Sequence, residues 1–195
     1  MRARTVGAVI VGLGFLSLIG AVWVPALRAR RHWRNQADAA PHHVSPSVSG
    51  DQLIGVVIVS STCAWSSRAN FPSTIREMNR LLVERAAQDH RRFIAVGVAV
   101  DWSATVGFEF LRRFGPFDEI LAGGNWANTG AIDYLWRLPP STTAPSGTPE
   151  VLIFERHVAW DSAGRNLQVG ENRLVLRKAG VDQIDEWVKM QAPLR

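Results

Sequence analysis

The chain has 195 residues, of which 47% are hydrophobic and 9% aromatic, and it carries 22 Lys and Arg against 17 Asp and Glu. This length and composition exclude a disordered chain and indicate one ordinary domain with an appendage, while the single Cys excludes an intrachain disulfide, a zinc knuckle and an iron–sulfur site. The excess positive charge lies in residues 1–50, so residues 51–195 are neutral and lack the basic surface that nucleic-acid binding requires.

The first predicted element is a transmembrane helix. Residues 5–27 carry no charge and consist mainly of Val, Ile, Leu, Gly and Ala, and about 20 such residues cross a bilayer as a helix. The run is longer than the apolar region of a cleaved signal peptide, so we expect a retained signal-anchor. We assign residues 1–34 to a single membrane anchor with basic flanks, and residues 35–50, which lack hydrophobic periodicity, to a flexible tether.

Two arguments about the orientation of this anchor point in opposite directions. Four Arg follow the apolar run and two precede it, which by the positive-inside rule favours a cytoplasmic domain. A short amino-terminal tail with two Arg is also typical of the start of a secretory signal, which stays inside while the rest of the chain is exported. On the second argument we expect an extracytoplasmic domain on the periplasmic side.

A strand, a helix and a second strand open the domain predicted over residues 51–195. Residues 54–60 and 93–100 are rich in β-branched side chains and show no alternation, as expected for strands buried on both faces. Between them, apolar residues recur at steps of three and four and form one helical stripe: Phe71, Ile75, Met78, Leu82 and Ala86. A connection of this length predicts two parallel strands joined by a right-handed crossover helix.

Shorter elements are predicted in the second half of the domain. They are a helix over 104–114, a strand over 119–122, a helix from 128 or 129 that ends before 139, strands over 151–154 and 174–176, and a helix over 181–192. Ser103 is a predicted helix cap, and either Asn128 or Thr129 is predicted to cap the later helix. Turn-forming residues at 161–164 predict that the last two strands form an antiparallel hairpin.

Two short segments resemble the active-site region of the thioredoxin-like superfamily. Cys63 and Ser66 lie between the first strand and the first helix, where thioredoxins carry Cys-x-x-Cys, and Thr148-Pro149 precedes a later strand, where the fold keeps a cis proline. Pro72 matches a proline common in the first helix of the family. The resemblance implies an α/β fold, namely a thioredoxin-like three-layer sandwich with an inserted strand and helix, preceded by one N-terminal transmembrane helix. The insertion resembles the peroxiredoxin and cytochrome-biogenesis branches.

Two departures from the family pattern restrict the chemistry. Ser66 replaces the second Cys, so the motif is Cys-x-x-Ser and lacks the thiol that resolves a mixed disulfide. Pro72 also follows Cys63 one residue later than in the family pattern. Either the turn carries one extra residue, or Cys63 takes the place of the Trp that normally precedes the motif and the thiol is off the helix N-terminus.

The resemblance implies a thiol redox protein in which Cys63 is the nucleophile. A helix N-terminus lowers the pKa of a thiol, and Cys63 is predicted to lie immediately before a helix. Ser66 is predicted to donate a hydrogen bond to the sulfur, and Arg68 to add positive charge from the first turn.

Substrate contacts are predicted at Trp65 and at the turn formed by Thr148 and Pro149, where an extended segment of a client protein would pair with the backbone. With one Cys, the chemistry is limited to forming and releasing mixed disulfides with protein thiols and disulfides, as in a monothiol–disulfide oxidoreductase. Neither a metal nor another cofactor is expected.

Other interpretations stay open at this point. The domain could be a degenerate module that binds partners through the same groove without chemistry, or Cys63 could be an inert, buried small hydrophobe. A thiol peroxidase is a third interpretation, since Ser60 fits the hydroxyl position of the peroxiredoxin pattern, although Val56 stands where that pattern has Pro. Asp101, which ends the second strand, is predicted either to face a cleft as a base or to cap a turn.

Overall fold

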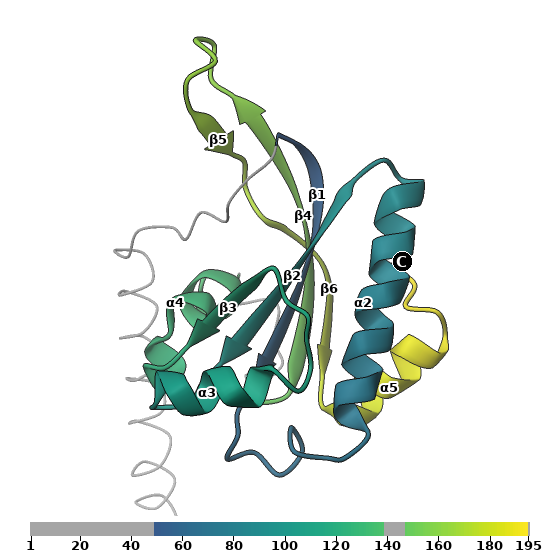
Figure 1. Ribbon diagram of the computed structural model, residues 1–195. Coiled ribbons are helices and arrows are strands. Elements are labelled where there is room, and N and C mark those ends of the chain that lie inside the picture. Colours follow the sequence, from purple (N-terminus) through teal and green to yellow (C-terminus); the bar gives the residue numbers. More distant parts are fainter. Residues whose placement is uncertain (1–48, 139–146, 195) are drawn as a thin grey trace, which may run out of the picture. The chain divides into compact units, whose positions relative to one another are not determined.

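The computed structural model describes residues 49–138 and 147–194 (Figure 1). The predicted membrane anchor over residues 1–34, and the predicted tether up to residue 48, lie outside the described residues. Within the two described ranges, none of the helices combines the length and the apolar character that a membrane crossing needs.

A parallel strand–helix–strand unit opens the domain, as predicted. β1 (Gly50–Val59) and β2 (Arg92–Ala99) pair in parallel, with Val59 opposite Ala99, and α2 (Phe71–Gln88) connects them. The second half of β1 is buried on both faces, which explains why its β-branched run lacks alternation.

A second helix and a third parallel strand extend the sheet at one edge. α3 (Ala104–Leu111) leads to β3 (Glu119–Ala122), which pairs in parallel with β2. Ser103 caps α3, as predicted, because its hydroxyl accepts a hydrogen bond from the Val106 N–H at 3.4 Å.

Three short helical segments follow β3. They are η1 (Asn125–Ala127), α4 (Thr129–Ala131) and the π-helical turn η2 (Ile132–Trp136). Asn128 caps α4, as predicted, by accepting a hydrogen bond from the Gly130 N–H at 2.8 Å. The helix expected after residue 128 is therefore one α-helical turn that continues into a π-helical turn.

The predicted hairpin near the carboxyl terminus is only partly right. β4 (Glu150–Trp160) pairs antiparallel with β1 and with β6 (Arg173–Ala179), but it is much longer than the predicted strand over 151–154. Its far half pairs with an additional strand, β5 (Leu167–Val169), so the turn after Trp160 leads into β5 rather than into β6 (Figure 1). The sheet order is β3-β2-β1-β4-β5, with β6 also on β4, and α5 (Val181–Lys189) closes the domain.

Apolar clusters on both faces of the sheet form the core. Val57 faces the cluster formed with α2, α3 and α5, while its neighbour Ile58 faces the cluster formed with α4 and η2. The large buried side chains Trp187 of α5 and Tyr134 of η2 fill opposite layers. The three-layer arrangement is thus confirmed, with helices on both faces of a mixed sheet (Figure 1).

The topology also decides where loops gather. β1 and β2 run parallel and β4 runs opposite to them, so the loops after β1 and β2 meet the segment before β4 at one end of the sheet (Figure 1). Residues from these three segments form the site described next.

Candidate functional site

Cys63 lies in the loop between β1 and α2 and begins an isolated turn. Its N–H donates to the carbonyl oxygen of Ser60 at 3.2 Å, and its own carbonyl accepts from the Ser67 N–H at 3.1 Å. α2 begins only at Phe71. The prediction that the sulfur lies immediately before the first helix is therefore wrong, and the N-terminal dipole of α2 is not the group that acts on it.

The residues between this turn and α2 explain the late start of the helix. The Arg68 N–H donates to the carbonyl oxygen of Trp65 at 3.3 Å, and the Phe71 N–H donates to that of Arg68 at 3.1 Å. These separate turns use the backbone that a longer helix would need. Pro72 lies in the first turn of α2, where its missing N–H costs no hydrogen bond, so it suits the observed helix start.

The sulfur of Cys63 faces the turn before β4. Sγ donates a hydrogen bond to the carbonyl oxygen of Thr148 at 3.1 Å, although the two residues are 85 positions apart in the chain. The peptide bond between Thr148 and Pro149 is cis, and Pro149 is buried. The fold thus brings together Cys63 and the two residues of the predicted substrate turn, and it confirms the cis proline.

The pKa of the Cys63 thiol is lowered from its ordinary value. Burial alone raises this pKa, but hydrogen bonds from the Thr148 side chain, from the N–H and hydroxyl of Ser66 and from the Trp65 N–H stabilise the thiolate and outweigh burial. The contact with the Thr148 carbonyl acts in the opposite sense, since only a protonated thiol donates to it. Because the residue is half-buried, the thiolate is partly accessible.

Ser66 supports both the sulfur and the loop. Its side chain is fully buried, donates to the Cys63 sulfur as predicted, and accepts a hydrogen bond from the Ser60 N–H at 3.5 Å. A buried hydroxyl in this position can stabilise the thiolate but does not meet an incoming client. The catalytic role of Ser66 stays a prediction.

Trp65 and Arg68 form the exposed side of the same loop. Trp65 is 52% exposed, and the Arg68 guanidinium carbon lies 4.1 Å from the centre of its ring. Arg68 also forms an ion pair with Asp182 of α5, at 2.8 Å from Nη1 to Oδ1. The predicted help of Arg68 to the sulfur is therefore not observed: hydrogen bonds and burial act on the Cys63 pKa, while this guanidinium is engaged with Trp65 and α5.

A buried carboxylate holds the start of the loop, and its partner was not recognised from sequence. Asp101, directly after β2 and 5% exposed, accepts from the Ser61 hydroxyl at 2.5 Å on Oδ1 and from the Ser61 N–H at 3.1 Å and 3.3 Å on its two oxygens. The cap of α3 is Ser103 instead. The available signal was an Asp at the carboxyl end of a strand predicted to lie beside β1.

A second buried carboxylate holds the opposite wall of the site. Glu150 follows Pro149, has a fully buried side chain, and forms an ion pair with Arg177 of β6. Burial raises the pKa of Glu150, while hydrogen bonds from Arg177 and from the Gly147 N–H act against that rise. The sequence offered no signal for this role beyond an acidic residue at the start of a buried strand.

The groups named for the other interpretations are placed differently: the backbone of Ser60 contacts the Cys63 turn, but its hydroxyl does not. The Ser60 hydroxyl contacts the Thr62 hydroxyl at 2.9 Å, and Val56 is buried inside β1. His157 contacts Asp51 at the other end of the sheet. In the part of the chain that the structure describes, there is no group of three or more His, Cys, Asp or Glu placed to hold a metal ion.

No protein-family model matches the chain, and no curated protein matches it either. Among solved structures, the thioredoxin domain of a Bacteroides vulgatus thiol-disulfide oxidoreductase aligns at 14% identity and a TM-score of 0.36, covering 79% of this chain and 99% of that one. Copper-bound yeast Sco1 aligns at 14% identity and a TM-score of 0.34, covering 73% and 76%. BsSco, a member of the Sco family of cytochrome c oxidase assembly proteins, aligns at 12% identity and a TM-score of 0.31, covering 74% and 82%.

TM-scores and identities this low establish neither a shared site nor a shared activity. The order of elements, the antiparallel β4 and β6 after the parallel β1–α2–β2 unit, and the cis Pro149 beside Cys63 are features of the chain itself. They give the domain the thioredoxin-like fold that its sequence predicts.

Proposed function

We propose that the protein is a monothiol redox protein in which Cys63 forms and releases mixed disulfides with client proteins. The observation that carries the proposal is the position of the sulfur, half-buried and hydrogen-bonded at the turn of Thr148 and cis Pro149. A lowered thiol pKa places more of the nucleophilic thiolate at neutral pH, which is what disulfide exchange requires.

The proposed step balances without a second cysteine in the chain. The Cys63 thiolate attacks one sulfur of a client disulfide, so a new S–S bond forms to Cys63 and the old S–S bond breaks. The second client sulfur leaves as a thiolate and takes a proton from water. Release of the client then requires an external thiol, whose sulfur forms a disulfide with the client and returns the Cys63 thiolate.

The residues around the sulfur suit a peptide client. When Cys63 is a thiolate or part of a disulfide it no longer donates to the Thr148 carbonyl, so that oxygen becomes available to accept an N–H from an extended client segment. The exposed indole of Trp65 provides an apolar surface on the same loop. On these grounds we assign Trp65 and Thr148 to substrate binding, and the buried Pro149 to the turn that presents the Thr148 carbonyl.

We also propose that residues 1–34 anchor the protein in a membrane and hold the domain on the extracytoplasmic side. The support is the uncharged run over residues 5–27, with its basic flanks, and the short Arg-containing amino-terminal tail. A reporter that is active in one compartment only, fused after Arg195, tests the orientation. Activity of a periplasm-specific reporter supports the proposal, and activity of a cytoplasm-specific reporter alone contradicts it.

The redox proposal is tested by incubating the full-length chain with a peptide disulfide and measuring the adduct mass. We expect a one-to-one mixed disulfide at Cys63 that dissociates when glutathione is added. We also expect iodoacetamide to alkylate Cys63 faster than it alkylates glutathione at neutral pH. Slow alkylation that accelerates only in denaturant would show an inert buried thiol and reject the proposal.

The same experiment separates the redox protein from a module that only binds. Cys63→Ser is expected to abolish every covalent adduct and to lose partners that are captured as disulfides. If Cys63→Ser retains all partners with unchanged affinity, the domain is a binding platform and the redox proposal is rejected. A peroxidase is identified separately, by hydrogen peroxide consumption with an added reductant.

A further inference from the structure

A buried carboxylate contacts the loop that carries the proposed nucleophile. Asp101 accepts hydrogen bonds from both donors of Ser61. The hydroxyl donates at 2.5 Å, and the N–H lies 3.1 Å and 3.3 Å from the two carboxylate oxygens. Asp101 is 5% exposed, so these bonds form away from bulk water and hold Ser61 more firmly than exposed ones would. One end of the loop is therefore fixed to the strand beside it.

The sheet holds Asp101 itself in place. The Val100 N–H donates to the Val59 carbonyl at 2.9 Å, which extends the pairing of β1 and β2 to the edge of the loop. On its other side, the Asp101 carbonyl accepts from the Asn125 N–H at 3.0 Å. The carboxylate thus projects from a backbone segment that is bonded on both sides, which makes it a rigid support.

The support is transmitted from Ser61 toward the sulfur through neighbouring bonds. The Ser61 carbonyl accepts a hydrogen bond from the Ser67 hydroxyl at 3.4 Å. The carbonyl of the adjacent Ser60 accepts one from the Cys63 N–H at 3.2 Å. The Ser60 N–H in turn donates to the Ser66 hydroxyl at 3.5 Å. Restraining Ser61 therefore restrains both ends of the turn that presents the sulfur.

We infer that Asp101 is a positioning residue for Cys63: by binding Ser61 it holds the turn of residues 63–67 against the Thr148 carbonyl. This inference rests on the proposed function, because it concerns the same nucleophile. Without the carboxylate, the hydrogen bonds that the N–H of Trp65 and the hydroxyl and N–H of Ser66 direct at the sulfur lose their alignment.

A positioning role and a purely electrostatic role predict opposite effects. A carboxylate that acted on the sulfur through its charge would disfavour the thiolate, so removing it would lower the pKa of Cys63. A carboxylate that keeps the donors aligned favours the thiolate, so removing it would raise that pKa. The sign of the change therefore distinguishes the two roles, and a control variant separates both from a general loss of stability.

The test is the pH dependence of iodoacetamide alkylation in the full-length chain, for wild type, Asp101→Ala and Asp101→Asn. Asp101→Ala is expected to raise the kinetic pKa and to slow alkylation at pH 7 by about three- to tenfold, the change expected for a pKa rise of about half a unit to one unit. Asp101→Asn keeps one oxygen that accepts from Ser61, so it is expected to fall between wild type and Asp101→Ala.

Asp118→Ala is the matched control. Like Asp101, Asp118 accepts a hydrogen bond from a backbone N–H, but its donor is Ala95 of β2, at 2.7 Å, and it lies before β3, away from the Cys63 loop. It is expected to leave the kinetic pKa of Cys63 unchanged. Circular dichroism of each variant identifies folded samples, and Asp101→Asn carries the test if Asp101→Ala does not fold.

The outcomes separate this inference from the proposed function. If wild-type Cys63 has an ordinary pKa and reacts slowly, the proposed function fails. If the wild-type thiol is reactive and both folded Asp101 variants leave its pKa unchanged or lower it, the proposed function stands and the positioning role is rejected. An equal rise in Asp118→Ala would show a general effect of destabilisation and would also reject that role.

Discussion

The two ends of the sheet place their carboxylates in different surroundings. At the Cys63 end, Asp101 and Glu150 are 5% and 0% exposed. Asp101 accepts from the hydroxyl and N–H of Ser61, and Glu150 binds Arg177 and the Gly147 N–H. Each carboxylate therefore restrains a loop that contributes to the site.

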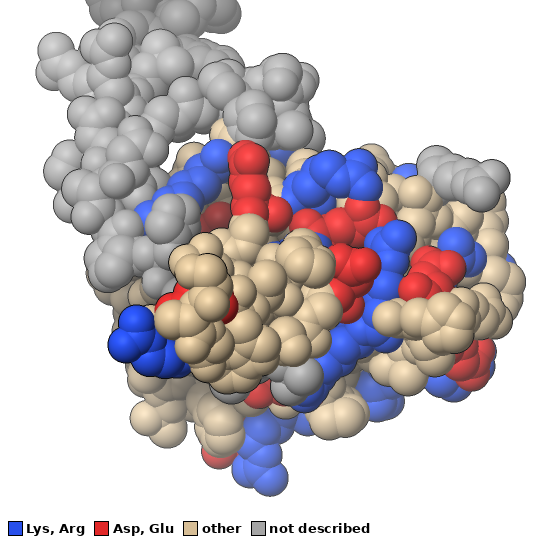
Figure 2. All heavy atoms as spheres, turned by 90° about the horizontal axis from the view of Figure 1, so that it is seen from above, with Lys and Arg blue, Asp and Glu red and all other residues tan. Residues whose placement is uncertain are grey.

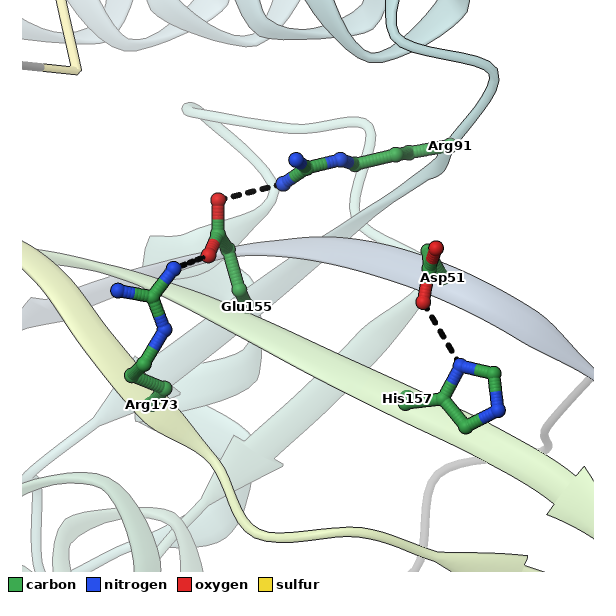
Figure 3. A network of polar contacts seen from close by, with 5 residues as sticks. All are labelled: Asp51, Arg91, Glu155, His157 and Arg173. Atoms are coloured by element: carbon green, nitrogen blue, oxygen red, sulfur yellow. Dashed lines mark hydrogen bonds and ion pairs between the residues drawn. The ribbon is translucent and has the colours of Figure 1, made fainter.

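At the opposite end, acidic and basic side chains form ion pairs near the surface. Seen from above, Lys and Arg side chains alternate with Asp and Glu on this end (Figure 2). Glu155 lies between Arg91 and Arg173, and Asp51 contacts His157 at 2.7 Å from Oδ1 to Nδ1 (Figure 3). The Asp51 and His157 side chains are both 64% exposed, so water and salt screen their attraction.

This difference indicates how strongly each end of the sheet depends on its carboxylates. Solvated ion pairs contribute little, because each charge is almost as stable in water, whereas a buried carboxylate must keep its donors or lose stability. The two most buried carboxylates lie at the end that carries Cys63, as expected if the position of the sulfur matters. Four predictions test this comparison.

The largest effect is expected from Glu150→Ala. It removes a fully buried carboxylate from Arg177 and from the Gly147 N–H, and it is expected to lower the free energy of unfolding by about 3 kcal/mol. Glu155→Ala is the comparison at the other end: it removes a carboxylate that is 22% exposed and paired with Arg91 and Arg173, so it is expected to cost less, about 1 kcal/mol. Urea unfolding of the full-length variants measures both, and equal losses would contradict the contrast between the two ends.

The pH dependence of stability is expected to differ in sign between these two residues. Ion pairs and hydrogen bonds with Arg91 and Arg173 lower the pKa of Glu155 against the opposing effect of its burial, so its contribution is lost as pH falls below the unfolded value of about 4.3. Burial raises the pKa of Glu150, so folded Glu150 takes up its proton at higher pH than the unfolded chain does. Its contribution therefore grows as pH falls through the folded pKa.

Urea unfolding at a series of pH values, with Glu155→Gln and Glu150→Gln as references, measures these two contributions. On acidification, the free energy of unfolding of wild type should fall relative to that of Glu155→Gln. Relative to that of Glu150→Gln, it should rise. Two gaps that change in the same direction would mean that one of the two environments is assigned wrongly.

A smaller effect, confined to the sulfur, is expected from Ser66→Ala. It removes a hydroxyl that stabilises the Cys63 thiolate, so the thiol pKa should rise and the alkylation rate at pH 7 should fall by about threefold. Ser73→Ala removes an exposed hydroxyl that donates to the Asn70 carbonyl beside the start of α2, outside the contacts of the Cys63 turn, and should leave the rate unchanged. The same slowing in both variants would show that the loop responds to any substitution rather than to the loss of this hydrogen bond.

The smallest effect is expected from the exposed pair of Asp51 and His157. A double-mutant cycle with Asp51→Ala and His157→Ala should give a coupling energy below about 0.5 kcal/mol, and added salt should reduce it further. A coupling comparable to the loss in Glu150→Ala would remove the proposed distinction between the two ends.

Elements with a strong local pattern were predictable from the sequence. The β-branched run in β1 reflects burial on both faces of the strand, and the apolar stripe of α2 reflects burial on one face of the helix. Both elements form where predicted. The cis bond before Pro149 was expected only from the resemblance to the thioredoxin-like superfamily, because a Thr-Pro pair before a strand does not by itself favour the cis form. β5 was missed because three exposed or half-exposed residues on an edge carry no periodic signal.

The site was less predictable because its geometry depends on contacts between distant residues. The contact between Ser61 and Asp101 joins residues 40 positions apart, and it exists only because β1 and β2 pair with Val59 beside Ala99. The turn that begins at Cys63 was placed too close to α2, since several turn conformations compete in this loop and local propensity does not choose between them.

The measurement that tests the account most directly is the thiol pKa of Cys63 in the full-length native chain. Titration of the ultraviolet absorbance of the thiolate, with Cys63→Ser as the blank, reports this single group. The account predicts a pKa clearly below that of a free cysteine, because Thr148, Ser66 and Trp65 stabilise the thiolate more than burial disfavours it. A pKa at or above the value of free cysteine would contradict it.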